Sequence, residues 1–187
     1  MVRCHLNLTL NLANPWSSDT LRTHVKGVLT RNAEWESVLA GFSVESAWMV
    51  GAWEDVEKLV GQTKAQSAPI AMARLLLAIR SGEASAISDN LIAARSVVGL
   101  PITASGVNGY RNSYDAVLDL HLTHELQIIH DAMANFPASS QGPNQKRRQD
   151  ILTDMSKSLS SRLASLLPTL RIREPVLSMR RTAFALR

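Results

Sequence analysis

The sequence predicts an all-α fold in which helical hairpins stack on one another, and three observations indicate it. Apolar residues recur every three or four positions in at least five segments, which is the period of an amphipathic helix. Helix breakers separate these segments, at Gly82, Gly99 and Pro168. In one segment Trp48, Gly51 and Trp53 follow the order of large residue, glycine and aromatic residue that opens a helical-hairpin repeat. In such a repeat the glycine lets the two helices approach closely, and the aromatic residues fill the gap between them. Together these patterns predict an α-solenoid with hairpins like those of TPR or HEAT repeats.

The first 18 residues form an arm whose structure the pattern leaves open. From His5 to Leu12 apolar and polar residues alternate, which is a strand pattern, but no partner strand is evident elsewhere. The arm is therefore either extended or part of a helix. After the breaker Asn14-Pro15, three polar residues can cap a helix that runs to about Asn32: Ser17, Ser18 and Asp19. We assign residues 1–18 to the arm and residues 19–187 to the repeat region.

Two helix pairs are expected next. The first spans about Ser37 to Gly61. The second begins at Ser67-Ala68-Pro69, because proline is tolerated in the first turn of a helix. The stretch from Ile70 to Ile79 is apolar on nearly all sides and predicts a buried inner helix that ends at Gly82. The partner helix then runs until two breakers stop it, Gly99 and Pro101.

The C-terminal part of the repeat region predicts three more helices. The longest runs from Tyr110 to about Met133. Residues 137–149 are polar and should form a mobile loop that carries Lys146-Arg147-Arg148. A further helix runs from Ile151 to Leu166, and Glu174-Pro175 opens the last one.

In this last helix, arginines lie within an apolar face. Arg173, Arg180 and Arg187 are seven residues apart, so they share one narrow stripe. Buried guanidinium groups need carboxylate or carbonyl partners, so the stripe either docks on an acidic neighbouring helix or extends its charges to water. The apolar residues beside the stripe predict a surface that seeks a partner.

Composition narrows the class of protein. The chain has 187 residues, 45% of them hydrophobic, which suffices for a sizeable core in one domain. The net charge of +4 is spread along the sequence, so nucleic acid is not expected as a direct partner, and the lack of a long apolar run argues against a membrane. The single cysteine, Cys4, cannot form an internal disulfide, which favours the nucleus or cytosol. No apolar run approaches the length of a membrane-spanning helix.

No catalytic, cofactor-binding or metal site is predicted in this chain. His121 and His124 are three residues apart with Glu125 after them, whereas zinc-protease helices need histidines four apart or a glutamate directly before the second one. A metal-dependent hydrolase would require a third ligand to converge on this pair. Neither a phosphate-binding loop nor the motifs of a kinase active site are present. The three cations Lys146-Arg147-Arg148 indicate solvated surface more strongly than a nuclear-import or phosphate-binding patch.

Trp48 and Trp53 are interpreted as packing residues. They could also form a ligand cage or a stacking platform, but their spacing within a helical hairpin favours the core.

Four segments in order resemble a known family. They are the Trp48/Trp53 hairpin; Ala73 to Ala78; the stretch from Tyr110 to Leu126 with Ser113-Tyr114, Leu120-His121-Leu122 and Glu125-Leu126; and the helix with Glu174-Pro175 and Arg180-Arg181. From roughly Leu21 to Arg187 the chain resembles the FAT region of ATR-type checkpoint kinases, members of the phosphatidylinositol-kinase-related protein kinase family. Structural or interface roles are expected for ten residues: Trp48, Gly51, Trp53, Tyr114, His121, Glu125, Glu174, Pro175, Arg180 and Arg181.

The resemblance implies a non-catalytic scaffold segment, incomplete at the C-terminus, of a nuclear serine/threonine protein kinase. Such a parent would use ATP and magnesium to phosphorylate Ser or Thr followed by Gln in DNA-damage and replication-checkpoint signalling. The implied partners are the parent's own kinase domain, neighbouring helical repeats, a second copy in a homodimer, and regulatory proteins. The alternative is a free-standing TPR-like adaptor that binds a peptide or partner protein, which should end in a polar capping helix.

Overall fold

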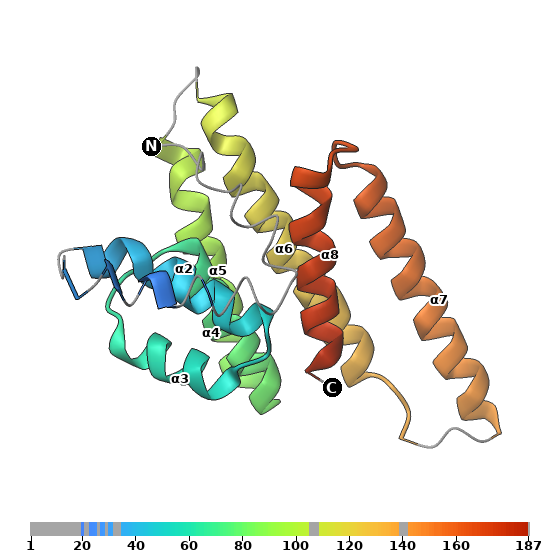
Figure 1. Cartoon of the computed structure of the whole chain (residues 1–187). Helices are drawn as coiled ribbons and strands as arrows, with labels where there is room; N and C mark the ends of the chain where they lie inside the picture. The colour runs from blue at the N-terminus through green and yellow to red at the C-terminus, as the bar shows by residue number, and fades with distance from the viewer. Residues whose placement is uncertain are drawn as a thin grey trace. The chain divides into compact units, whose positions relative to one another are not determined.

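The computed structural model describes residues 20, 23–25, 27–28, 30–31, 35–104, 109–138 and 142–186. At residues 37–38 and 110–112 it describes the backbone but not the side chains. Within these ranges every regular element is a helix and no strand occurs, which confirms the all-α prediction (Figure 1). The predicted arm, the caps Ser17, Ser18 and Asp19, and the terminal Arg187 lie outside the described residues. The chain divides into two compact units, residues 1–117 and 118–187.

The first unit is built around the buried helix α4 (Ala68–Ser81). The unit contains α2 (Glu36–Met49), α3 (Trp53–Gln62), α4, α5 (Ala84–Ala104) and the start of α6 (Tyr110–Ala134). Helix α4 packs against α2, α3 and α5. As predicted, α4 is buried on most sides. Its buried residues are Ile70, Ala71, Met72, Ala73, Leu75, Leu76, Ala78 and Ile79. Helix α4 ends at Gly82, whose φ of 74° is a left-handed conformation that glycine adopts without a steric cost.

The predicted hairpin between α2 and α3 is confirmed, but its glycine has a different purpose. Gly51 is exposed, and its φ of 78° lets the amides of Gly51 and Ala52 bond back to the Trp48 and Ala47 carbonyls at 3.1 and 3.0 Å. This pair of bonds is the Schellman motif that ends many helices. The close approach expected of Gly51 occurs at Gly41 instead, where an added Cβ would lie 3.3 Å from Ser67 Oγ.

Helix α5 does not stop at Gly99 and Pro101, as the sequence pattern predicted. It continues to Ala104 with Pro101 inside the helix. Proline removes only one backbone donor, and here it does so in the final turn of α5. The Thr103 hydroxyl donates to the Leu100 carbonyl at 3.0 Å and so satisfies an acceptor near the helix end.

The second unit consists of the rest of α6, α7 (Pro143–Ala164) and α8 (Leu170–Ala185). Its buried apolar residues come from all three helices: Leu118, Leu122, Leu126 and Ile129; Met155 and Leu159; and Ile172, Val176, Met179 and Ala183. This small core holds the polar cluster described below.

Two predicted boundaries in this unit were wrong. The part of the polar stretch 137–149 from Pro143 onward is helical, because α7 begins at Pro143 and includes Lys146-Arg147-Arg148 in its first turns. Proline suits the first helical position, and exposed polar side chains need no burial on the outer side of a helix. Helix α8 begins at Leu170, and Pro175 lies inside it instead of opening it. Burial of Ile172 before the proline and Val176 after it favours one continuous helix.

Candidate functional site: a buried ion cluster

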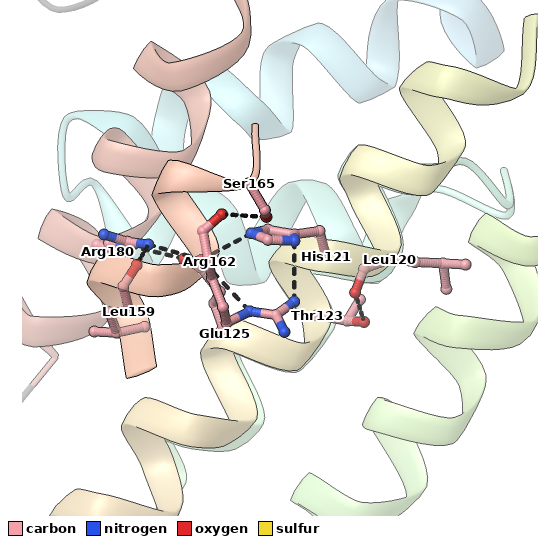
Figure 2. A network of polar contacts seen from close by, with 8 residues as sticks. All are labelled: Leu120, His121, Thr123, Glu125, Leu159, Arg162, Ser165 and Arg180. Carbon is pink, nitrogen blue, oxygen red and sulfur yellow. Dashed lines mark hydrogen bonds and ion pairs between the residues drawn. The ribbon is translucent and has the colours of Figure 1, made fainter. Parts of the chain in front are cut away.

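Four polar side chains from α6, α7 and α8 meet inside the second unit, and we call them the ion cluster: His121, Glu125, Arg162 and Arg180 (Figure 2). Glu125 lies at its centre, with 1% of its surface exposed. Because a carboxylate this deeply buried is destabilising unless its charge and lone pairs are matched, the cluster depends on the groups around Glu125.

Arg180 makes the shortest contacts with the Glu125 carboxylate. Its Nε donates to Glu125 Oε2 at 2.7 Å and its Nη2 to Glu125 Oε1 at 2.8 Å, which is a two-point guanidinium–carboxylate contact. The same Nη2 donates to the Leu159 carbonyl of α7 at 2.7 Å. One side chain of α8 is therefore bonded to both α6 and α7.

Arg162 joins α7 to the other side of the cluster. Its Nη2 lies 3.0 Å from His121 Nδ1, and its Nε lies 3.7 Å from Glu125 Oε1. That Nε is buried and has no hydrogen-bond partner in the part of the chain that is described. Ser165 Oγ donates to the Arg162 carbonyl at 2.7 Å, near the end of α7.

The partners of His121 determine its protonation. Arginine can only donate, so Nδ1 must accept from Arg162; Nε2 then carries the proton and donates to Glu125 Oε1 at 2.9 Å. This is a neutral imidazole. Burial, and next the positive charge of Arg162, lower the pKa of His121 below its ordinary 6.5, against the opposing influence of Glu125.

Helix periodicity explains why these side chains converge. His121 and Glu125 are four residues apart on α6 and so share a face, as do Leu159 and Arg162, three apart on α7. The prediction that the arginine stripe docks on an acidic neighbouring helix is confirmed for Arg180. That neighbour is α6 of this chain, which sequence spacing alone could not reveal.

The cluster can act as a cross-link between helices and is poorly suited to catalysis. Both oxygens of Glu125 accept hydrogen bonds from within the protein, and almost none of its surface reaches solvent. A general base must reach a substrate proton, and this carboxylate is enclosed. His124 is exposed and is not a member of the cluster, and no group of three metal-binding side chains occurs among the described residues.

The other predicted residues are not members of this cluster. Trp48 is buried, with 4% exposed, and its Nε1 has no partner within the described ranges. Trp53 is half-buried, and the Arg80 guanidinium lies 5.8 Å from its ring. Tyr114 is half-buried. Three predicted residues share α8 with Arg180: Glu174, which accepts from Ser178 Oγ at 2.8 Å; Pro175, inside the helix; and Arg181, which is exposed.

Sequence reasoning missed Arg162 and the Leu159 carbonyl. A signal for Arg162 exists, because it stands three residues after the buried Leu159 and so on the inner side of α7. No comparable signal exists for a backbone carbonyl.

Among the described helices, none is both long enough and apolar enough to cross a membrane.

Comparison with known proteins identifies the family. The sequence model of the FAT domain matches residues 40–187. Three similar proteins each bear the name serine/threonine-protein kinase ATR. The one from Arabidopsis thaliana is 26% identical over 96% of this chain, the one from Oryza sativa subsp. indica 20% over 97%, and the one from Drosophila melanogaster 29% over 75%. The matched regions are 7%, 7% and 6% of those proteins, so the chain spans a small fraction of their length. This chain belongs to the FAT domain family, and its relatives are ATR-type kinases.

Proposed function

We propose that this chain is a non-catalytic helical scaffold segment of an ATR-like serine/threonine protein kinase that acts in DNA-damage and replication-checkpoint signalling. The FAT match and the names of the relatives support the assignment. The structural observation that carries the scaffold role is the ion cluster, in which Arg180 bonds to Glu125 of α6 and Leu159 of α7. Such bonds resist relative movement of the helices, so force or displacement applied to one helix is passed to its neighbours.

The remaining parts of the proposal concern the parent protein. Its kinase domain would use ATP and magnesium, and this segment would support that domain in the nucleus. The expected contacts are the kinase domain, neighbouring helical repeats, a second copy in a homodimer, and regulatory proteins. We propose no catalytic activity, metal, nucleic-acid contact or membrane contact for the segment itself.

The first experiment is to sequence the transcript on both sides of this chain. A continuing reading frame that encodes a kinase domain is the expected result. A frame that encodes only helical repeats would replace the proposal with the TPR-like adaptor.

The second experiment tests the scaffold role in the full-length protein. Kinase activity on a peptide with a Ser-Gln site is measured for wild type, Arg180→Ala and the control Arg147→Ala, which removes an exposed arginine of α7. Arg180 bonds to both α6 and α7 whereas Arg147 is not part of the ion cluster, so Arg180→Ala should lower activity and Arg147→Ala should not. Equal activity of all three proteins, with Arg180→Ala shown to be destabilised, would refute mechanical support by this segment.

A further inference from the structure

Helix α8 carries a row of exposed apolar residues that nothing in the described chain covers. Leu170, Leu177 and Phe184 are spaced seven residues apart, and 68%, 49% and 41% of their surfaces are exposed. At 100° per residue they lie within about 40° of one another around the helix. We call these three residues the α8 stripe. Apolar residues with this spacing form the seam along which a second helix packs.

Two arginines beside the stripe lack carboxylate partners among the described residues. Arg181 projects from the same side of α8, between Leu177 and Phe184, and is exposed. Arg173 lies at the edge of the stripe. Its Nε is buried with no hydrogen-bond partner in the described ranges, and its Nη2 makes one long contact of 3.4 Å with the Leu166 carbonyl. Arg180, seven residues later, shows the satisfied state, since it has a carboxylate at 2.7 and 2.8 Å.

The positive charge of α8 indicates that a partner on this surface is negatively charged. The helix contains four arginines and one glutamate, and that glutamate accepts from Ser178 within the same helix. Two copies of this surface would bring arginines together, which is unfavourable. A helix with carboxylates beside its apolar residues would cover the stripe and match the arginines at once.

We propose that the α8 stripe, with Arg173 and Arg181, is a docking surface for an acidic amphipathic helix. The two arginines are eight residues apart, which is about 12 Å along the axis at 1.5 Å per residue. The partner therefore presents two carboxylates about two turns apart on either side of a leucine-type stripe. This inference concerns the surface of α8 alone and does not depend on the proposed function.

A designed peptide tests the proposal with the full 187-residue chain. The probe is a fluorescein-labelled amphipathic helix of about 20 residues, long enough to be helical in water, with a leucine stripe and two flanking glutamates two turns apart. The control peptide has lysines in place of the two glutamates. Fluorescence anisotropy measures the binding of each peptide to wild type, Leu177→Ser, Arg181→Ala and Arg181→Glu.

A matched control protein is Leu152→Ser, which changes an exposed leucine on α7 and leaves α8 unchanged. All the substituted residues are exposed, so circular dichroism and melting should remain close to wild type. The charge reversal Arg181→Glu gives a gain of binding that cannot arise from misfolding.

We expect the glutamate peptide to bind with a Kd on the order of 10 μM and the lysine peptide not to bind. Leu177→Ser and Arg181→Ala should each weaken binding about tenfold or more, Leu152→Ser should not, and Arg181→Glu should shift preference to the lysine peptide. Absence of saturable binding below about 1 mM would overturn the proposal. So would equal binding of both peptides, or a dimer of the chain alone, seen by light scattering, that Leu177→Ser abolishes.

Discussion

Removing Arg180 should expose how strongly the ion cluster holds the second unit together. In Arg180→Ala, the Glu125 carboxylate stays buried, with 1% exposed, but loses contacts of 2.7 and 2.8 Å. It would retain His121 Nε2 at 2.9 Å and the more distant Arg162 Nε at 3.7 Å. Breaking a buried ion pair from one side costs roughly 3–5 kcal/mol because the remaining charge is uncompensated. The Leu159 carbonyl also loses its bond from Arg180, so we expect the upper part of this range.

The assay is urea unfolding of the 187-residue chain, followed by far-ultraviolet circular dichroism. Arg181→Ala is the control, since it removes the same type of side chain from an exposed neighbouring position. We expect it to change the free energy of unfolding by about 0.5 kcal/mol or less. The double variant Glu125→Met with Arg180→Met removes the buried carboxylate together with its closest partner. It should recover part of the lost stability, because the charge of the cluster that remains is that of Arg162, whose side chain is 26% exposed.

Two results would refute this reasoning. If Arg180→Ala cost no more than Arg181→Ala, the cluster would contribute nothing to stability. If the double variant were less stable than Arg180→Ala, the cost would come from lost packing and not from an unpaired carboxylate.

Three further predictions concern other residues. Trp48→Ala should cost about 3–5 kcal/mol because the ring is buried, and an unchanged melting temperature would contradict this. Folding lowers the pKa of His121, so the neutral side chain stabilises the protein. This contribution is complete above pH 6.5 and is lost as the pH falls through the folded-state pKa. The free energy of unfolding, measured by urea titrations across this range, should depend less on pH in His121→Gln than in wild type. Gly51→Ala should destabilise the chain by about 1 kcal/mol at its φ of 78°, whereas Gly61→Ala, inside α3 with open space around it, should be neutral or stabilising in thermal melts.

Local patterns predicted most of the helices because a single helix face must be apolar wherever it packs. Helix α4 is the clearest case, since a stretch apolar on nearly all sides has to be buried on nearly all sides. Glycine and proline predicted the ends of helices less reliably than apolar periodicity predicted their presence. Gly82 ends α4 as predicted, but Pro101 and Pro175 lie inside helices. A proline removes one donor, and continued burial of residues such as Val176 outweighs that loss.

The ion cluster was predictable only in parts. The spacing of His121 and Glu125 placed them on one face of a helix, and the position of Arg180 in an apolar face required an acidic or carbonyl partner. The identity of that partner was not predictable, because Glu125 and Arg180 are 55 residues apart and only the packing of α6 against α8 brings them together.

The sequence by itself determined the all-α class, the buried inner helix, the Trp48 hairpin and the resemblance to the FAT family, because each depends on residues close together in the chain or on their order. Only the tertiary structure decided that Arg180 is satisfied by Glu125 while Arg173 and Arg181 have no carboxylate partner among the residues that the structure describes. The physical reason is that helix period fixes which side chains share a face, whereas the pairing of faces from different helices depends on how the whole core packs.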